Sequence, residues 1–457
     1  MLLTCFKLYD VRGELGVNFD APIAYKIGRA VSQHLNAKVV VVGRDARESS
    51  PELAEAVMSG IMDSGANVLD IGLSGTEEMY WAVSEFNACA GIEITASHNP
   101  INYNGLKFVK SESQPLNAKR DLLEIKRIAQ ASDWKHNRFK AYKKNIALLA
   151  RKNYAKKVLS FVNLRDISAH KIVVNSGNGA AGPTFDFIAA ILKEKKIPIE
   201  FIRMHHDPDH TFPNGIPNPL LAEGHSKMKQ AVLNYGADFG IAFDGDFDRC
   251  FFFDESGKFV SGEYIVGLLA TAFLDKEPQA KIVHDPRVIW NIQDAVESKG
   301  GLCVSSITGH AFIKETMRKH NAIYGGELSA HHYFRDFAYC DSGMIPWLIV
   351  LEMLSKARSS LGNLLEKRLD KFPSSGEINF SISNPQNVID LVQNHYKNDT
   401  KSFNDLDGLS LEFEDWRLNL RKSNTEPLVR LNIESKDNRE IIDQKVNEIR
   451  EIINSII

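Results

Sequence analysis

The chain has 457 residues, of which 44% are hydrophobic and 25% are charged, as in an ordinary folded globular protein. Its net charge of −3 gives no overall basic field that would attract nucleic acid or an anionic membrane surface. The five cysteines form no CxxC pair and no apolar stretch approaches the ~18 residues of a membrane span, so we expect a cytoplasmic protein without nucleic-acid or membrane partners.

The first 150 residues alternate between strand and helix patterns. The run KVVVVGRD (38–45) predicts a buried strand, SPELAEAVMSGIMDSG (50–65) predicts a helix with a proline in its first turn, and NVLDIG (67–72) predicts the next strand. A strand–helix–strand order implies a parallel sheet. The polar, lysine-rich region 111–150 is interpreted as helix and connection.

One serine stands out within GIEITASHNPINYNGLKF. Ser97 lies between Thr95 and His98 in a polar turn, and Asn99 and Pro100 follow it. Serine commonly caps the start of a helix, but a small hydroxyl in a polar turn also suits nucleophilic chemistry. The residue types alone leave both interpretations open.

A glycine-rich turn follows the strand pattern at 170–175. Gly177, Gly179 and Gly182 satisfy the dinucleotide-binding pattern G-x-G-x-x-G. A nicotinamide-dependent oxidoreductase would also need an acidic residue at the end of the next strand, but Glu200 stands at the start of that strand. We therefore favour a turn that is tight for packing, and keep an oxidoreductase as the alternative from a different functional class.

Three aspartates alternate in DGDFDR, within the strand–turn–strand pattern of 237–257. Asp244, Asp246 and Asp248 would point to one side, where close carboxylates repel one another unless a cation lies among them. Hard oxygen ligands suit Mg²⁺, Mn²⁺ or Ca²⁺. An EF-hand is disfavoured because Arg249 occupies the position that requires glycine. A solvated acidic turn is the simpler alternative.

Further strands are predicted at 280–286 and 322–329, the second of which runs into GGELSAHH. Glu327, Ser329 and His331 alternate there, and on one face they would suit the hydroxyls of a sugar. A polar loop end explains them equally well. After about residue 370, alternating strands and the final helix pattern REIIDQKVNEIREIINSII predict a small α+β domain with an antiparallel sheet.

The turn in RKSNTEPLVR offers one more polar cluster. Its hydroxyls, amides and guanidinium groups could hold a phosphate, although serine and asparagine also suit a plain hairpin turn. The residues concerned are Arg421, Ser423, Asn424, Thr425 and Arg430.

Five motifs, YDVRG, TASHNP, DGDFDR, GELSAHH and RKSNTEP, occur in this order along the chain. The set resembles the α-D-phosphohexomutase superfamily, and TGHAFIK and FPNGIPNPL are most similar to its bacterial mannose-specific branch. The resemblance implies an α/β fold of four domains around a central cleft. Three similar α/β domains with mixed or parallel sheets are expected at 1–150, 151–255 and 256–368, and a C-terminal α+β domain resembling the TATA-binding-protein fold at 369–457.

The resemblance also implies roles for individual residues. Ser97 would be the phosphorylated serine, and one Mg²⁺ per chain would bind Ser97, Asp244, Asp246 and Asp248. Catalytic candidates are Ser97, Arg12, His98, Lys107, Arg249 and His331, and candidates for substrate binding are Arg287, His310, Glu327, Ser329, Arg421, Ser423, Asn424, Thr425 and Arg430. Phe247 and Ala330 stand where many members of the superfamily have glycine.

The implied reaction is the interconversion of mannose 6-phosphate and mannose 1-phosphate. It would proceed through a phosphoserine enzyme and mannose 1,6-bisphosphate, with a sugar 1,6-bisphosphate as activator and with Arg12, Lys107 and His331 as unranked candidates for the acid and base. The partners would be hexose phosphates, the chain a monomer or weak homodimer, and the product a supply for GDP-mannose. An enzyme that accepts both mannose and glucose phosphates remains an alternative.

Overall fold

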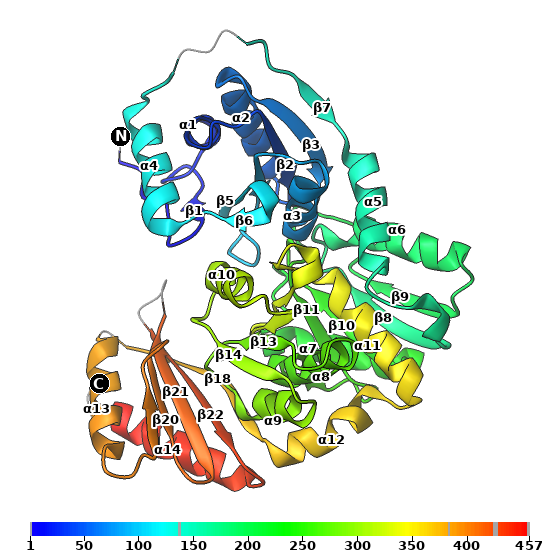
Figure 1. Ribbon diagram of the computed structural model, residues 1–457, viewed down its shortest axis with the longest axis vertical. Coiled ribbons are helices and arrows are strands. Elements are labelled where there is room, and N and C mark those ends of the chain that lie inside the picture. Colours follow the sequence, from blue (N-terminus) through cyan, green and yellow to red (C-terminus); the bar gives the residue numbers. More distant parts are fainter. Residues whose placement is uncertain (1, 136–138, 383, 424–427, 455–457) are drawn as a thin grey trace. The chain divides into compact units, whose positions relative to one another are not determined.

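A computed structural model describes residues 2–135, 139–382, 384–423 and 428–454 (Figure 1). The chain forms two compact units, of which the first comprises Met1–Phe259 and His331–Ser360 and the second comprises Val260–Ala330 and Leu361–Ile457. Helices and strands alternate along most of the chain, so the expected α/β class is confirmed.

The first unit begins with a mixed sheet in the strand order β1-β5-β4-β2-β3-β7, with β6 beside β5. Its strands are β1 (Val11–Glu14), β2 (Val39–Arg44), β3 (Asn67–Leu73), β4 (Ala90–Ile94), β5 (Tyr103–Lys110), β6 (Gln114–Pro115) and β7 (Lys143–Asn145). Strand β2 is parallel to β3 and β4, as the strand–helix–strand pattern predicts, whereas β5 runs antiparallel to β4.

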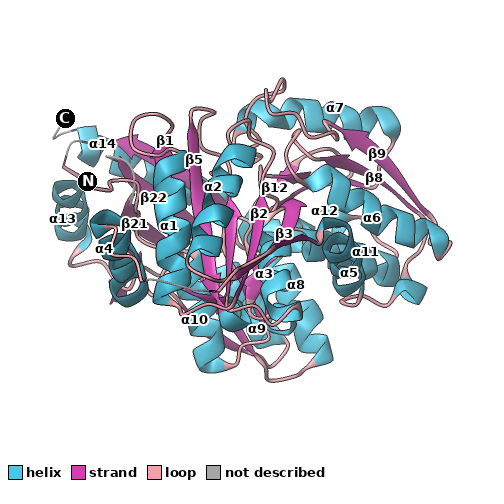
Figure 2. Cartoon of the chain, turned by 90° about the horizontal axis from the view of Figure 1, so that it is seen from above, coloured by secondary structure: helices cyan, strands magenta, loops and turns pink. Residues whose placement is uncertain are grey.

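Helices cover both faces of this sheet. The helices are α1 (Ala21–His34), α2 (Ser50–Asp63), α3 (Thr76–Glu85), α4 (Leu123–Ala131) and α5 (Ala147–Leu159). Apolar residues of α1, α2 and α4 share one buried core with β2, β3 and β4, and Figure 2 shows α1 and α2 side by side. Helix α3 covers the opposite face, because a Cβ at Gly91 of β4 would meet Met79 and Val83. The predicted helix at 50–65 is confirmed as α2.

A second mixed sheet of the first unit has the order β12-β11-β10-β8-β9. Its strands are β8 (His170–Asn175), β9 (Ile199–Met204), β10 (Phe239–Phe243), β11 (Cys250–Phe253) and β12 (Phe259–Val260), and its helices are α6 (Ala181–Glu194) and α7 (His225–Tyr235). Strands β8, β9 and β10 are parallel, and β11 returns antiparallel to β10 after the acidic turn. The first unit also contains β16 (His332–Phe334), β17 (Cys340–Asp341) and α11 (Met344–Ala357).

The glycine-rich turn after β8 has a packing role. Gly177 has a φ of +60°, and a Cβ at Gly182 would lie 2.0 Å from the carbonyl oxygen of His206. A Cβ at Gly179 would lie 2.8 Å from the carbonyl oxygen of Gly245, in the acidic turn. The glycines are therefore explained by close backbone contacts, as the packing interpretation expects.

The second unit combines parallel and antiparallel sheets. Strands β13 (Lys281–His284), β14 (Leu302–Ser305) and β15 (Tyr324–Gly326) are parallel, and the neighbouring helices are α8 (Gly262–Lys276), α9 (Trp290–Ser298), α10 (His310–His320) and α12 (Leu361–Lys371). The antiparallel sheet has the order β18-β22-β21-β20-β19. It contains β18 (Ser374–Ser381), β19 (Ser402–Asn404), β20 (Leu409–Glu412), β21 (Trp416–Lys422) and β22 (Leu428–Ser435), with helices α13 (Pro385–Tyr396) and α14 (Arg439–Asn454). The predicted C-terminal α+β domain is confirmed.

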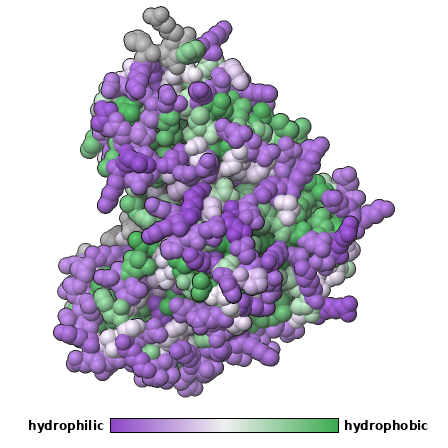
Figure 3. All heavy atoms as spheres, viewed as in Figure 1, coloured by the Kyte–Doolittle hydropathy of each residue, from purple (hydrophilic) through white to green (hydrophobic). Residues whose placement is uncertain are grey.

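The structure also shows the character of the surface, of the helices and of the cysteines. Hydrophilic side chains predominate on the face shown in Figure 3. Among the described helices, none has both the length and the apolar character required to cross a bilayer. All five cysteines are free thiols.

Candidate active site

Ser97 lies in a turn that follows the carboxyl end of β4 in the first sheet. The parallel neighbour of β4, strand β2, ends on the same side of the sheet. The Ser97 φ of +50° is left-handed, a conformation that costs a residue other than glycine about 1–3 kcal/mol and is concentrated at functional sites. The next regular element is strand β5, so the helix-cap interpretation of Ser97 is wrong. Instead, the Ser97 N–H donates to Thr95 Oγ1 at 2.8 Å.

Arg47 holds the turn that carries Ser97. Its side chain is buried, and its Nη1 donates to the carbonyl oxygens of Pro100 at 2.9 Å and Tyr103 at 3.0 Å. Its Nη2 donates to the carbonyl oxygens of Ser97 at 3.0 Å and Asn99 at 2.6 Å. One guanidinium group thus fixes four carbonyl groups of the turn.

Sequence reasoning missed Arg47. The available signal was its place in KVVVVGRDAR, just beyond the carboxyl end of a predicted parallel strand, where functional groups of α/β sheets gather. Asp45 positions Arg47, since the Arg47 N–H donates to Asp45 Oδ1 at 3.0 Å.

Replacing Arg47 is expected to impair catalysis more than substrate binding. Arg47→Ala should lower kcat roughly 100-fold, the scale of a misplacement of about 1 Å near the reacting atoms, while KM changes much less. Added guanidinium ion should restore part of the lost kcat. Arg127→Ala is the control, because Arg127 pairs with Glu124 within α4 and should leave kcat unchanged. An unaffected kcat in Arg47→Ala would contradict the proposed role of Arg47 in positioning the Ser97 turn.

The acidic turn between β10 and β11 brings its three aspartates together. Carboxylate oxygens of Asp244, Asp246 and Asp248 lie within 4.8 Å of one another, and all three residues are buried. Phe247 fixes the turn with its buried ring, since a Cβ at Gly75 would lie 2.3 Å from Phe247 Cε1. The aspartates therefore form one cluster rather than a solvated surface turn.

Two positions at which the resemblance implies glycine in many members of the superfamily have left-handed backbones. The φ of Phe247 is +45° and that of Ala330 is +68°. Glycine adopts such values without steric cost. Glycine at either position thus matches the local backbone, and the larger residues in this chain adopt it at some expense of strain.

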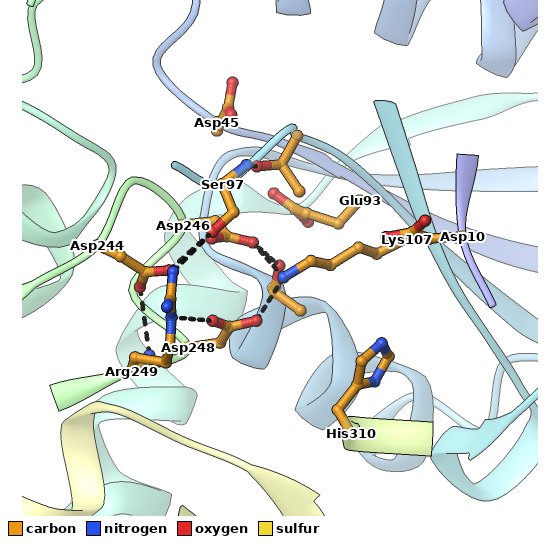
Figure 4. A network of polar contacts seen from close by, with 12 residues as sticks. Asp10, Asp45, Glu93, Ser97, Lys107, Asp244, Asp246, Asp248, Arg249 and His310 are labelled. Atoms are coloured by element: carbon orange, nitrogen blue, oxygen red, sulfur yellow. Dashed lines mark hydrogen bonds and ion pairs between the residues drawn. The ribbon is translucent and has the colours of Figure 1, made fainter. Parts of the chain in front are cut away.

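The Ser97 hydroxyl contacts both a carboxylate and a guanidinium group (Figure 4). Ser97 Oγ donates to Asp244 Oδ2 at 2.8 Å and accepts from Arg249 Nη2 at 3.3 Å. Arg249 also donates to Asp244 Oδ2 from Nε at 2.9 Å and from Nη2 at 2.6 Å. His98 Nδ1 lies 3.1 Å from Ser97 Oγ, and burial and Arg249 hold the pKa of His98 well below its usual value.

Lys107 of β5 supplies the opposite charge for the other two aspartates. Its Nζ lies 2.7 Å from Asp246 Oδ2 and also pairs with Asp248, as Figure 4 shows. Thr76 donates a further hydrogen bond to Asp246 Oδ2. His331 Nε2 lies 3.6 Å from Asp248 Oδ1. Although burial opposes ionisation, Lys107 and His331 hold the pKa of Asp248 well below its usual value.

The aspartate cluster has the donors that a hard divalent cation needs. Oδ1 of Asp246 and Oδ1 of Asp248 are buried and accept no hydrogen bond from the described residues. Burial, despite Arg249, raises the pKa of Asp244 to about 6. Three carboxylates, two of which have an unsatisfied oxygen, suit Mg²⁺ in both number and type of ligand.

Arg12 is oriented toward the same turn. Its Nε donates to Asp10 Oδ2 at 2.8 Å, and its Nη1 donates to Asn99 Oδ1 at 2.6 Å. The first unit thereby brings together Ser97, His98, Arg12, Lys107, Arg249, His331 and the three aspartates.

In the second unit, Glu327 follows β15. Residues 327–330 form a turn that is closed by a hydrogen bond of 3.0 Å from the Ala330 N–H to the Glu327 carbonyl oxygen. The strand predicted at 322–329 is therefore shorter than expected, because it ends at Gly326. Glu327 Oε1 accepts from the Gly309 N–H at 2.8 Å, next to His310 at the start of α10.

Arginines gather elsewhere in the second unit. Arg421 and Arg430 are opposite one another on β21 and β22, and both pair with Glu377 of β18. Arg287 also pairs with Glu377 and with Asp285. Sequence reasoning missed both carboxylates. The Ser423 N–H donates to the Leu428 carbonyl oxygen at 2.9 Å, whereas Asn424 and Thr425 lie outside the described residues.

Models of the four domains of one family match almost the whole chain. The models of the phosphoglucomutase/phosphomannomutase alpha/beta/alpha domains I, II and III match residues 4–136, 152–257 and 261–372, and the model of the C-terminal domain matches residues 377–452. The chain belongs to the phosphoglucomutase/phosphomannomutase family. It is therefore an intramolecular phosphotransferase of four domains, and the oxidoreductase alternative is excluded.

Individual members of the phosphoglucomutase/phosphomannomutase family resemble the chain over its whole length. The phosphomannomutase of Salmonella montevideo is 51% identical over 453 residues, which are 99% of both chains. A Xanthomonas campestris protein named phosphohexose mutases is 46% identical over 456 residues, 99% of this chain and 100% of its own. A crystal structure of a family protein from Burkholderia thailandensis superposes with a TM-score of 0.86 at 27% identity, over 99% of this chain and 97% of its own.

Proposed function

We propose that the chain is a phosphomannomutase that interconverts mannose 6-phosphate and mannose 1-phosphate through phosphorylated Ser97. The supporting observation is that the Ser97 hydroxyl is held between a buried aspartate cluster and Arg249. An identity of about 50% with curated bacterial phosphomannomutases over the whole chain supports the choice of mannose.

In the proposed reaction, the bond between Ser97 Oγ and phosphorus breaks while a free hydroxyl of the sugar monophosphate bonds to that phosphorus. Ser97 Oγ then bonds to the other phosphorus of the bisphosphate, the bond from that phosphorus to the sugar oxygen breaks, and the isomeric monophosphate leaves. Such transfers depend on positioning and on charge stabilisation. Arg249 lies against Ser97 Oγ, where it would stabilise the charge that develops. Arg12, Lys107 and His331 remain the candidates for moving the proton.

We assign one Mg²⁺ per chain to Asp244, Asp246, Asp248 and Ser97. The unsatisfied Oδ1 atoms of Asp246 and Asp248 support this assignment. When bound, the ion would neutralise charge on the phosphoryl oxygens. A sugar 1,6-bisphosphate would serve as activator by phosphorylating Ser97.

We assign the second unit's polar residues to the substrate. Glu327, Ser329 and His310 would contact the sugar, and the phosphate that is not transferred would bind Arg287, Arg421, Ser423, Asn424, Thr425 and Arg430. The buried Nε of Arg421, which donates no hydrogen bond to the described residues, supports a phosphate ligand there.

A comparison of substrates tests the proposed function. We expect kcat/KM for mannose 1-phosphate to exceed that for glucose 1-phosphate at least tenfold, about 1.4 kcal/mol in the transition state, in assays with Mg²⁺ and a trace of bisphosphate. Comparable values would instead establish a dual-specificity phosphomannomutase/phosphoglucomutase, an alternative that the Xanthomonas campestris relative supports. Absence of mutase activity with either sugar would overturn the proposal.

We also propose a cellular compartment, an oligomeric state and domain boundaries. The free thiols suit a reducing compartment, so we propose that the enzyme acts in the cytoplasm and supplies GDP-mannose synthesis. We further propose that it is a monomer or weak homodimer, with domain boundaries at 1–150, 151–255, 256–368 and 369–457.

A further inference from the structure

Three arginines of the second unit converge on one carboxylate. Glu377 Oε2 lies 3.1 Å from Arg421 Nη2 and 3.3 Å from Arg287 Nη1, and Glu377 Oε1 lies 2.9 Å from Arg430 Nη1. The side chain of Glu377 is 9% exposed and that of Arg421 is 8% exposed, so the pair is largely removed from water. Ion pairs in such surroundings are screened less than surface pairs.

The backbone of β18 directs the Glu377 side chain toward the three arginines. Strand β18 is antiparallel to β22, and its register shifts between Ser374 and Glu377, where Gly376 has a φ of +66°. Such bulges redirect the side chains beside them. Arg421 and Arg430 occupy paired positions on the neighbouring strands β21 and β22, so their side chains can reach the same carboxylate.

The Glu377 carboxylate offers the arginines acceptor oxygens and a negative charge, as a phosphate does. Carboxylates and phosphates both present two oxygens that accept parallel hydrogen bonds from the guanidinium fork. Burial opposes ionisation of Glu377, but Arg287, Arg421 and Arg430 together hold its pKa below the usual value. It is therefore ionised near neutral pH and carries the charge that a bound phosphate would otherwise provide.

We propose that Glu377 is a resident counter-ion that competes with the substrate phosphate for Arg421 and Arg430. This inference rests on the proposed function, which assigns those arginines to the phosphate that is not transferred. Without a phosphate, Glu377 keeps buried guanidinium groups paired, which would otherwise be costly. With a phosphate, it limits the affinity of the cluster. Excess binding of substrate and intermediate would lower kcat, so weaker retention favours a reaction in which a bisphosphate must be released and rebound.

The test compares Glu377→Gln with the natural enzyme. Gln keeps the size and one acceptor but removes the competing charge. The dissociation constant for inorganic phosphate, measured by competitive inhibition of the mutase, and the KM for mannose 1-phosphate should both fall roughly tenfold, the scale of one hydrogen bond to a charged group. The kcat should fall as well, because bound phosphates leave more slowly. A higher or unchanged KM would overturn the inference and make Glu377 a spacer that orients the arginines.

Two further variants separate this inference from the proposed function. Glu434→Gln is the matched control, because Glu434 is a buried glutamate of the same sheet that pairs with Arg417 at 2.7 Å and should leave phosphate affinity unchanged. Arg421→Ala tests the phosphate assignment itself. If Arg421→Ala leaves both constants unchanged, the assignment fails. If it weakens binding while Glu377→Gln does not strengthen it, only the counter-ion inference fails.

A second variant at the same position covers the case in which Glu377→Gln does not fold. Glu377→Asp keeps the charge but shortens the side chain by one methylene, which lengthens its contacts with the arginines. We expect it to tighten phosphate binding by a smaller factor than Gln. Unchanged or weaker phosphate binding by a folded Glu377→Asp enzyme would overturn the inference.

Discussion

Ser97→Ala is expected to lose mutase activity by roughly four orders of magnitude or more, the scale on which removal of a covalent nucleophile acts. The fold should persist, because the hydrogen bonds that hold the turn come from the backbone of Ser97 and from Arg47. Asp244 Oδ2, which accepts from Ser97 Oγ, would keep both hydrogen bonds from Arg249. The free energy of unfolding should therefore change by only about 1 kcal/mol, as for one lost hydrogen bond.

The measurement combines turnover with detection of the phosphoenzyme. After incubation with a sugar 1,6-bisphosphate, the intact mass of the natural enzyme should show an added phosphoryl group, and that of Ser97→Ala should not. Ser64→Ala is a suitable control, since Ser64 lies at the end of α2 and its hydroxyl bonds to Ser32. Substantial turnover by Ser97→Ala would remove the phosphoserine from the mechanism.

Local patterns were sufficient for much of the fold. The run at 38–45 contains four consecutive valines, as a buried parallel strand does, and corresponds to β2, and the predominantly apolar run at 67–72 corresponds to β3. The aspartate cluster could also be anticipated, because its three members belong to one short turn whose geometry depends on adjacent residues. Signals of this kind need no knowledge of distant parts of the chain.

Contacts between distant segments could not be predicted in the same way. Lys107 reaches Asp246 across 139 positions, and Arg47 reaches Ser97 across 50 positions. Glu377 meets Arg421 only because β18, β22 and β21 adopt one register, which no local pattern specifies. The left-handed backbone of Ser97 could not be predicted from the sequence either, which is why the helix-cap interpretation stayed open at that stage.

Lys107→Met is expected to lower the free energy of unfolding by about 3–5 kcal/mol in the absence of divalent cations, the usual cost of removing one partner from a buried ion pair. Lys107 is 5% exposed, and its ammonium group pairs with both Asp246 and Asp248. Met preserves much of the side-chain length and its apolar contacts. The loss of stability would therefore come from the buried carboxylates that remain without their counter-charge, and not from a cavity.

The measurement is unfolding in urea with EDTA and again with Mg²⁺. Added Mg²⁺ should recover more stability in Lys107→Met than in the natural enzyme, because a cation among the aspartates would replace part of the missing charge. Lys110→Met is the matched control, since Lys110 lies on the same strand and pairs with Asp121 at 3.4 Å in a more exposed position. It should cost less than about 1 kcal/mol. If the two variants lose equal stability, or if Mg²⁺ has the same effect on both, Lys107 does not balance the charge of the aspartate cluster.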